Sequence, residues 1–490
     1  MTKGVFVKRT YLASIVLLLT LAPAMRAQVA PVNSTQLMAW LAGGVASSQL
    51  SGLVRDRHMD FSPSEDYTRS LRLAGADKAL IETVRQLGRR AGTGRPEDCP
   101  RELVKAAELA HGGRFAEAEH GLRELLRSDP GNAALHFALG YVLRQQEEWE
   151  NAVAEFTESA RLMPGFPEAH NRLAYLFYHD DDDDSALAEA RTALSMDPNN
   201  AEAYHYLGLA LYGDGRYDAA LHAFQESLQR EPDNADVYYD IGITYRDMGD
   251  LRAAVVAYRH SIRLNPKSWE SHSNLALVLR DQGKLDDAVD EYREAKRLAP
   301  DEPSIRSSLG NTLCDKDEYD GAIAELRALY AMNPGWQGGH SCMAKAFMVK
   351  QQYQAAISEL HLAIQQNPTG AAEHRVLGQA LLIVGKNEEA VKELRTAVAL
   401  SPDSDLAHHY LGTALFQLQD FAAAEKEFRQ AVQLKSTADN HYSLAACLMS
   451  LSRNGEALAE LEIASHLDPE EKLYRARKEE LVRLMKGNPR

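Results

Sequence analysis

The sequence has few of the residues that hold small domains together through metals or disulfides. Among its 490 residues are four cysteines, and no two of them form a Cys-x-x-Cys pair. Their wide spread argues against a metal cage and against a disulfide framework. Two interpretations stay open: Cys314 and Cys342 pair in an oxidising compartment, or all four pack as small buried apolar side chains. The four are Cys99, Cys314, Cys342 and Cys447.

Catalytic and nucleotide-binding motifs are also missing. The sequence has no Gly-x-Ser-x-Gly, no glycine-rich phosphate loop that ends in Lys-Ser or Lys-Thr, and no His-Glu-x-x-His. No stretch outside the repeats described below is large enough for a catalytic domain. We therefore expect no enzymatic activity, no metal site and no cofactor.

Positive charge is scarce. Lysine and arginine number 54 against 70 aspartates and glutamates, which gives a net charge of −16. A surface of this sign repels phosphate backbones and anionic lipid headgroups. Nucleic acid is therefore excluded as an expected partner.

Long apolar runs are missing except near the N-terminus. Residues 12–22 form an apolar run that is too short to span a bilayer of roughly 30 Å. A basic start precedes the run and the small residues of "APAMRAQVA" follow it, as in a cleaved secretory signal. Residues 1–27 therefore predict an exported, periplasmic or extracellular protein with no membrane span after cleavage; an uncleaved anchor is the alternative. Cleavage changes the net charge from −16 to −20, because the segment carries four basic residues and no acid.

Most of the chain repeats at a constant interval. The interval equals the separation in sequence between Pro130 and Pro164. Proline recurs at this step nine times, followed by Ser436 at the tenth position and by Pro469 one residue early. In every repeat, the position equivalent to Ala152, counted back from Pro164, is alanine. The position equivalent to Gly140 is always glycine or alanine. The stepped prolines are Pro130, Pro164, Pro198, Pro232, Pro266, Pro300, Pro334, Pro368 and Pro402.

Each step contains two apolar stripes at helical spacing, as in "AYHYLGLALY" and "YDAALHAFQESL". Glycine, aspartate or asparagine between the stripes predicts a turn, and proline ends the second helix because its ring cannot continue it. The small columns predict a close approach of the two helices. One such pair cannot bury its apolar faces alone, so we expect neighbouring pairs to stack.

These repeated residues resemble the tetratricopeptide repeat family over residues 99–471, about three quarters of the chain. The resemblance implies an all-α, right-handed superhelical solenoid of about eleven helix-turn-helix repeats, with the first helices lining a concave groove. Residues 33–88 predict a small helical module. In it Ser62 caps a helix, Pro63 takes the first helical position, Glu65 completes the capping box, and Asp77 starts the next helix. Residues 89–98 read as a linker and residues 472–490 as a C-terminal capping helix.

The resemblance places three positions of each repeat in the groove, namely those that Phe137, Tyr141 and Arg144 take before Pro164. Aromatic residues and arginine, which dominate binding surfaces, gather at these positions in repeats two to six. The later repeats carry Ser307, Asn311, Ser341, Lys345, Gln379 and Thr413 in the same columns. The alternative is that some of the tyrosines only pack between repeats. The candidate groove residues are Phe137, Tyr141, Arg144, Tyr175, Tyr178, His205, Tyr212, Tyr239, Arg246 and Arg280.

Two polar patterns have plainer interpretations. Seven histidines share one position of the repeat, directly before the first groove position, where they predict packing between helices, with a pH-responsive stripe as the alternative. Five aspartates, residues 180–184, precede "SALAEA" and predict a solvated turn that caps a helix, with a calcium site as the alternative. The Lys/Asn/Arg clamp that some members of the family use has no matching set here, and of the asparagine ladder that others use only Asn274 is present. The histidines are His136, His170, His272, His340, His374, His408 and His441.

The prediction for function is an exported, non-catalytic scaffold that binds an extended segment of an unidentified protein or peptide partner in the groove. The alternative is a component of a cell-envelope assembly or secretion complex. Such a component would contact its partners through the outer helices and the N-terminal module. An enzyme is the third class, and no motif supports it.

Overall fold

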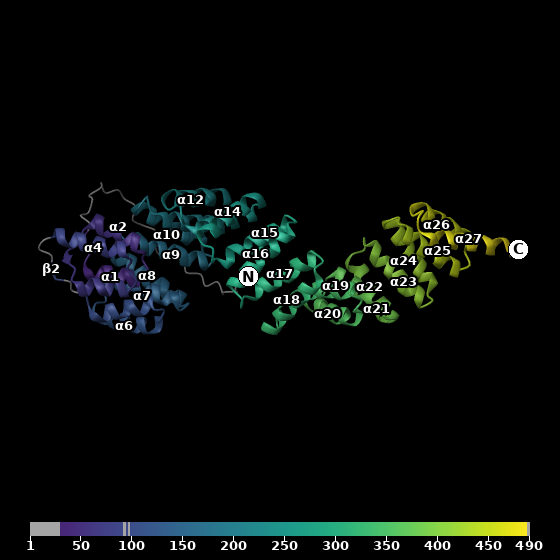
Figure 1. Ribbon diagram of the computed structural model, residues 1–490, viewed down its shortest axis with the longest axis horizontal. Helices are drawn as coiled ribbons and strands as arrows, with labels where there is room; N and C mark the ends of the chain where they lie inside the picture. Colours follow the sequence, from purple (N-terminus) through teal and green to yellow (C-terminus); the bar gives the residue numbers. More distant parts are fainter. Residues whose placement is uncertain (1–29, 92–94, 97–98, 488–490) are drawn as a thin grey trace. The chain divides into compact units, whose positions relative to one another are not determined.

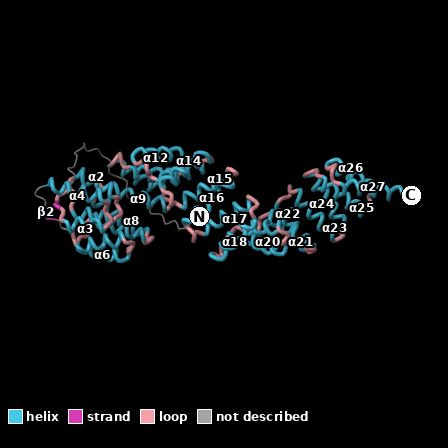
Figure 2. Tube along the Cα trace, in the orientation of Figure 1, coloured by secondary structure: helices cyan, strands magenta, loops and turns pink. Residues whose placement is uncertain are grey.

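The computed structural model describes residues 30–91, 95–96 and 99–487 as helical hairpins in two compact units, residues 1–232 and 233–490 (Figure 1). The expected signal, residues 1–27, lies outside the described residues, as does part of the linker. Two short strands, β1 (Phe61–Ser62) and β2 (Arg95–Pro96), pair in parallel (Figure 2). No helix in the described part of the chain is long and apolar enough to cross a membrane.

Unit 1 holds the N-terminal module and four repeats. The module comprises α1 (Ser34–Ala42), α2 (Ser47–Arg57), α3 (Glu65–Leu73) and α4 (Lys78–Ala91). The repeats comprise α5 (Arg101–His111), α6 (Phe115–Ser128), α7 (Ala133–Gln145), α8 (Trp149–Leu162), α9 (Pro167–His179), α10 (Asp183–Met196), α11 (Ala201–Gly213) and α12 (Tyr217–Arg230).

Unit 2 holds seven repeats and a final helix. Its helices are α13 (Ala235–Asp247), α14 (Leu251–Leu264), α15 (Trp269–Asp281), α16 (Leu285–Leu298), α17 (Pro303–Asp315), α18 (Tyr319–Met332), α19 (His340–Val349), α20 (Tyr353–Gln366), α21 (Ala371–Ile383), α22 (Asn387–Leu400), α23 (Asp405–Gln417), α24 (Phe421–Leu434), α25 (Ala438–Ser450), α26 (Asn454–Leu467) and α27 (Lys472–Gly487). The last helix covers the end of the stack, with Tyr474 and Leu481 buried.

The small column permits close contact between the two helices of a repeat, as the sequence predicts. A Cβ atom built on Gly208 of α11 would lie 2.4 Å from the ring of Phe224 on α12. On Gly378 of α21 it would lie 2.3 Å from Leu394. Such distances are far below ordinary contact, so a larger residue in this column separates the helices.

The turn between the two helices of every repeat contains one residue of positive φ. Five of these residues are glycines, where the left-handed backbone is free of side-chain strain. The other six are Glu147, Asp181, Asp317, Gln351, Gln419 and Ser452. Glutamate, glutamine and serine were not expected here, because the turns were predicted from glycine, aspartate and asparagine.

The N-terminal module shares one buried core with the first repeats. Trp40 of α1 is fully buried and stacks on Phe166, with ring centroids 4.9 Å apart. Phe166 in turn meets the edge of Phe137 on α7, with centroids 5.1 Å apart. Apolar residues of α1 and of α5 to α9 belong to the same cluster. The module is therefore integral to unit 1 and is not a separately packed body.

Helix capping in the module differs in one detail from the prediction. The N-cap of α3 is Ser64, whose hydroxyl accepts a hydrogen bond from the Tyr67 amide at 3.0 Å. Ser62 was predicted to cap this helix, but it lies in β1, and Glu65 is the first helical residue. The prediction for α4 is confirmed, because the Leu80 amide donates to Asp77 Oδ1 at 2.7 Å.

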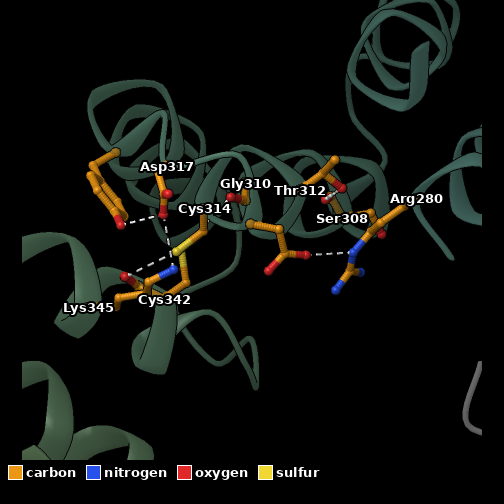
Figure 3. The surroundings of a disulfide bond; sticks show 10 residues. Arg280, Ser308, Gly310, Thr312, Cys314, Asp317, Cys342 and Lys345 are labelled. Carbon is orange, nitrogen blue, oxygen red and sulfur yellow. Dashed lines mark hydrogen bonds and ion pairs between the residues drawn. A yellow bond between two sulfur atoms is a disulfide. The ribbon is translucent and has the colours of Figure 1, made fainter. Parts of the chain in front are cut away.

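One joint of unit 2 departs from the repeat pattern. Helix α19 has 10 residues, whereas the first helices before and after it, α17 and α21, have 13. Its N-cap, Gly339, has φ 90° and provides no side-chain cap. A disulfide between Cys314 of α17 and Cys342 of α19, with Cα atoms 6.0 Å apart, ties the shortened helix to its neighbour (Figure 3). Of the two interpretations of these cysteines, the structure shows the pair.

Candidate functional site

The candidate site is formed by the side chains at the three groove positions of each repeat. In the second repeat these positions are Phe137, Tyr141 and Arg144. We call this set of side chains the first-helix surface. In unit 1 its N-terminal end is covered by the chain itself. Phe137 has an exposed fraction of 0%, and a Cβ atom built on Gly43 would lie 2.5 Å from its ring. A Cβ atom built on Gly44 would likewise lie 2.5 Å from the ring of Tyr141. Phe137 was predicted to face a partner, but it packs under the N-terminal module because this apolar ring is buried by an equally apolar helix.

The next predicted residues of unit 1, Arg144, Tyr175 and His205, are half-buried and contact side chains of the chain itself. The Arg144 guanidinium lies 4.2 Å from the centre of the Tyr175 ring, a cation–π contact. His205 stacks on the adjacent Tyr206 with centroids 5.7 Å apart. These contacts agree with the alternative that part of the aromatic column packs within and between repeats.

Tyr178 and Tyr212 lie further along the same two helices, α9 and α11, and are also half-buried. The Tyr178 ring lies 5.5 Å from that of His179, and the Tyr212 ring lies 5.6 Å from that of Tyr217. Both residues are partly exposed, so they remain candidates for contact with a partner.

The predicted cations of unit 2 already have partners. Arg246 donates to Asn274 Oδ1 at 2.9 Å and pairs with Asp247. The amide of the same Asn274 donates to Tyr239 Oη at 3.1 Å. Burial raises the pKa of Tyr239 to about 12, so it stays a neutral hydrogen-bonding group. Tyr239 and Arg246 thus form one polar chain across α13 and α15.

Arg280 of α15 also forms an ion pair within the chain. Its Nε lies 2.8 Å from Asp315 Oδ2 at the end of α17 (Figure 3). The two predicted groove arginines of unit 2, Arg246 and Arg280, therefore already pair with carboxylates of the chain itself.

An open hollow lies on the first-helix surface of later repeats, whose groove positions were not among the candidate groove residues. It has a volume of about 580 Å³ and lies over α19 and α21, and a second hollow of about 250 Å³ continues over α21 and α23. Val349 and Ile383 line the first hollow with exposed fractions of 58% and 49%. Ser341, Lys345 and Gln379 line it too, and Thr413 lines the second, so these columns border the cavity.

The charged groups around the hollow differ in how they are paired. Lys345 Nζ lies 3.2 Å from Asp317 Oδ1, beside the disulfide (Figure 3). Glu373 accepts a hydrogen bond from the Ser341 hydroxyl at 2.9 Å. Arg375 is half-buried in the lining and has no ion pair or hydrogen bond among the described residues.

A buried polar cluster in unit 1 escaped the sequence analysis. Arg172 of α9 donates to Glu202 Oε1 of α11 at 2.6 Å, and Gln49 of α2 donates to the same carboxylate. Glu168, 5% exposed, lies in the same region, with one carboxylate oxygen that has no hydrogen-bond partner among the described residues. Burial, helped by the nearby charge of Glu202, raises the pKa of Glu168 to about 7. A signal was present at Arg172, which takes the repeat position that Ala138 and Val376 occupy in other repeats.

The histidine column has a structural role that the sequence only partly revealed. Each of the seven rings is hydrogen-bonded through Nδ1 to a glutamate 19 residues later, at 2.5 to 2.7 Å. The bond joins the first helix of a repeat to its second helix, in agreement with the packing interpretation. The bond to Glu155 raises the pKa of His136. The matching glutamate column was the sequence signal that could have identified these pairs.

The five aspartates cap a helix. Asp182 is the N-cap of α10 and accepts a hydrogen bond from the Ser185 amide at 3.2 Å. Asp183 and Asp184 lie in the first turn, where negative charge is favourable. Within residues 30–91, 95–96 and 99–487, no group of three histidine, cysteine, aspartate or glutamate side chains is placed to hold a metal ion.

Solved structures with a similar arrangement of helices are distant in sequence. The Cut9–Hcn1 hetero-tetramer of APC/C is 14% identical with a TM-score of 0.40, and the match covers 91% of this chain and 89% of that one. PilF of Pseudomonas aeruginosa is 21% identical with a TM-score of 0.39, over 42% of this chain and 94% of that one. YrrB, described as a TPR protein with an unusual peptide-binding site, is 18% identical with a TM-score of 0.35, over 38% and 96%.

Sequence comparison is more specific. No curated protein matches the chain. A family model described as tetratricopeptide repeat matches residues 104–167, 239–303, 343–405, 375–441 and 409–472, and a second one of the same description matches residues 199–267. Because the first of these models alone matches more than half of the residues, the chain belongs to the tetratricopeptide repeat family.

Proposed function

We propose that this chain is an exported, non-catalytic scaffold that binds an extended partner segment along its first-helix surface, chiefly over α19, α21 and α23. Tetratricopeptide repeat proteins bind protein or peptide partners, and the family is generally non-catalytic. The observation that carries the proposal is the hollow of about 580 Å³ in which Val349 and Ile383 remain exposed. Large exposed apolar side chains that line a concavity are typical of a binding surface.

The proposal places the partner mainly on unit 2. In unit 1, Phe137 and the module helix α1 cover each other, which leaves Tyr178 and Tyr212 as the accessible candidates there. The partner segment is extended, because an extended chain advances roughly 3.3 Å per residue and neighbouring helices lie about 10 Å apart. Each repeat therefore meets about three partner residues.

Export is the second part of the proposal. The first 27 residues have the composition of a secretory signal. The disulfide between Cys314 and Cys342 supports an oxidising compartment, since stable disulfides are rare in the cytosol. Cell fractionation with mass spectrometry of the mature N-terminus tests this part, and a cytosolic, uncleaved chain would contradict it.

Site-specific photo-crosslinking in the native host tests the binding surface. A photoreactive residue at position 349 or 383 is expected to capture the same partner. The matched control is position 362 on the second helix α20, where Leu362 is also exposed. Substituting Ile383→Asp should abolish the crosslink formed from position 349.

The alternative function, an envelope assembly part that is contacted through outer helices, has one observation in its favour. Second helices carry exposed apolar side chains such as Val256, Leu362 and Ile463. Crosslinks from position 362 without crosslinks from position 383 would select this alternative.

In unit 1, replacing both Tyr178 and Tyr212 by alanine should weaken binding of the captured partner without changing the helical content. Both residues are half-buried and neither belongs to the fully buried core, so we expect their loss to remove contact area with little effect on the core. Affinity measurement together with circular dichroism checks this. Unchanged affinity would confine the binding surface to unit 2.

A further inference from the structure

We infer that the hollow over α19, α21 and α23 recognises a partner segment in which a carboxylate lies next to an apolar side chain, and that Arg375 is the counterion of that carboxylate. The inference rests on the proposed function and adds the chemistry of the partner. Its basis is a comparison of the cations along the first-helix surface.

The other cations on this surface are already engaged. Arg246 and Arg280 pair with Asp247 and Asp315, and Lys345 pairs with Asp317. Arg144 in unit 1 lies over the ring of Tyr175. Arg375 is different, because among the residues that the structure describes it has neither an ion pair nor a hydrogen bond.

The position of Arg375 makes an unpaired state unfavourable. The side chain is half-buried in a lining that includes Val349, Val376 and Ile383. A guanidinium always carries its charge, and partial removal from water costs free energy unless an anion or several acceptors replace the lost solvent. The Tyr410 hydroxyl is close enough for the two groups to interact electrostatically, but it stays neutral because burial raises its pKa.

The carboxylate in the same lining does not serve this purpose. Glu373 accepts from the Ser341 hydroxyl and lies in the first turn of α21, where a negative charge is stabilised by the helix N-terminus. Arg375 is thus the cation of this lining that has no ion pair among the described residues. The net charge of −16 is spread over the whole chain. At physiological ionic strength, charges more than about 8 Å away are largely screened. The acidic chain as a whole therefore does not prevent an ion pair between Arg375 and a carboxylate of the partner.

The apolar part of the ligand follows from the same lining. Val349 and Ile383 expose roughly half of their surface next to Arg375. An aliphatic or aromatic side chain of the partner covers them and lowers the local dielectric. A carboxylate paired with Arg375 gains from this, since charge-assisted, bidentate bonds to arginine strengthen when water is excluded. Apolar contact and ion pair therefore reinforce each other.

A displayed library of random twelve-residue peptides, selected against the full chain, tests the inference. The expected result is a set of sequences with aspartate or glutamate next to leucine, isoleucine or phenylalanine. A selected peptide is then synthesised with an amidated C-terminus, in the acidic form and with each acid replaced by its amide. Fluorescence anisotropy gives the affinity of each form.

Four variants define the contact. Arg375→Gln should weaken binding of the acidic peptide about tenfold or more, the effect of losing a charged hydrogen bond, and leave binding of the amide peptide unchanged. Arg375→Lys should restore part of the loss. Arg395→Gln, the same change on a residue of the second helix α22, is the matched control and should have no effect. Ile383→Asp should abolish binding of both peptides.

The outcomes separate the two claims. If the acidic and amide peptides bind equally and Arg375→Gln changes neither, while Ile383→Asp abolishes binding, the inference is overturned and the groove remains a binding site. If no peptide binds more tightly to the wild-type chain than to Ile383→Asp, the proposed groove function falls, and the inference falls with it. The inference is supported if Arg375→Gln loses the preference for the acidic peptide while Arg395→Gln keeps it.

Discussion

The first helices of unit 1 and of unit 2 carry related columns of side chains, yet the two surfaces differ in access. In unit 1 the column begins with Phe137, which is buried against the N-terminal module of the same chain. In unit 2 the equivalent columns of α19 and α21 border an open hollow with Val349 and Ile383 at its wall. Large aromatic residues therefore do not by themselves mark a free surface in a repeat protein, because they also attract the chain's own apolar segments.

The largest effect should come from removing the anchor of the module. Trp40→Ala deletes a fully buried ring that stacks on Phe166, and it should destabilise unit 1 by about 4 kcal/mol. Ile383→Ala in unit 2 is the matched change at an open site and should cost less than about 1 kcal/mol. Hydrogen exchange of peptides from α1, α7 and α21 measures both. Equal effects in the two units would remove the contrast between a covered and an open surface.

The disulfide should be the next largest contribution, and it concerns unit 2 alone. Replacing Cys314 and Cys342 by alanine opens a loop of 28 residues and should cost about 3 kcal/mol. Exchange should rise in α17 and α19, and the binding of peptides to the hollow should weaken, because Ser341 and Lys345 flank Cys342. Reducing agent should reproduce the effect in the wild-type chain. Cys99→Ala, which removes a cysteine of unit 1, serves as the control. Protection of α19 that survives reduction would argue against a stabilising role of the disulfide.

A change of pH should affect unit 1 through Glu168. Its pKa rises from 4.5 to about 7 on folding, mainly through burial, with Glu202 opposing ionisation and Arg57 and Arg172 favouring it. The folded state thus binds the proton more tightly than the unfolded chain does. This stabilisation is fully present below pH 4.5 and is lost as the pH rises through 7, by at most about 3 kcal/mol.

Hydrogen exchange of α2 and α9 between pH 5 and pH 8, corrected for the intrinsic rate, measures this loss. Glu168→Gln should remove the pH dependence in unit 1. Peptides of α19 and α21 provide the internal reference for unit 2. A decrease in protection that persists in the Gln variant would assign the effect to another group.

The smallest effects should come from the turns, where the two units are alike. Gln351 in unit 2 adopts φ 59°, and Gly215 in unit 1 adopts φ 74° with open space around it. Gln351→Gly should stabilise unit 2, and Gly215→Ala should destabilise unit 1, each by about 0.5 to 1 kcal/mol. Denaturant titration with region-specific exchange measures both. Effects of the same sign would show that the left-handed residue is not the controlling feature of these turns.

Much of the fold was predictable because it depends on contacts that recur within one repeat. The proline step, the alanine column and the glycine positions report how two neighbouring helices pack, and the structure shows Gly208 against Phe224 as that pattern requires. The histidines were assigned to packing for the same reason, although their glutamate partners were not identified. Glu147 and Gln351 in left-handed turns were missed, since nothing local marks these residue types for positive φ.

The candidate site was less predictable because it depends on contacts between distant residues. Trp40 and Phe166 stack although they are far apart in the sequence, and no periodic pattern connects them. The pairing of Arg280 with Asp315 and the lack of a partner for Arg375 among the described residues likewise follow from where helices of different repeats end. Residue type indicated that arginine matters on this surface, but it did not indicate which arginine remains available.

The amino-acid sequence alone was sufficient to establish the helical hairpins, their stacking and the family, because each depends on interactions that recur at the constant step of the prolines. The tertiary structure decided which part of the first-helix surface the module covers and which cysteines form a disulfide. It also decided which cation of the described first-helix surface has no ion pair. These properties arise from single, non-repeated contacts such as Trp40 with Phe166 and Cys314 with Cys342. A contact that occurs once leaves no periodic trace in a sequence, whereas one that occurs in every repeat does.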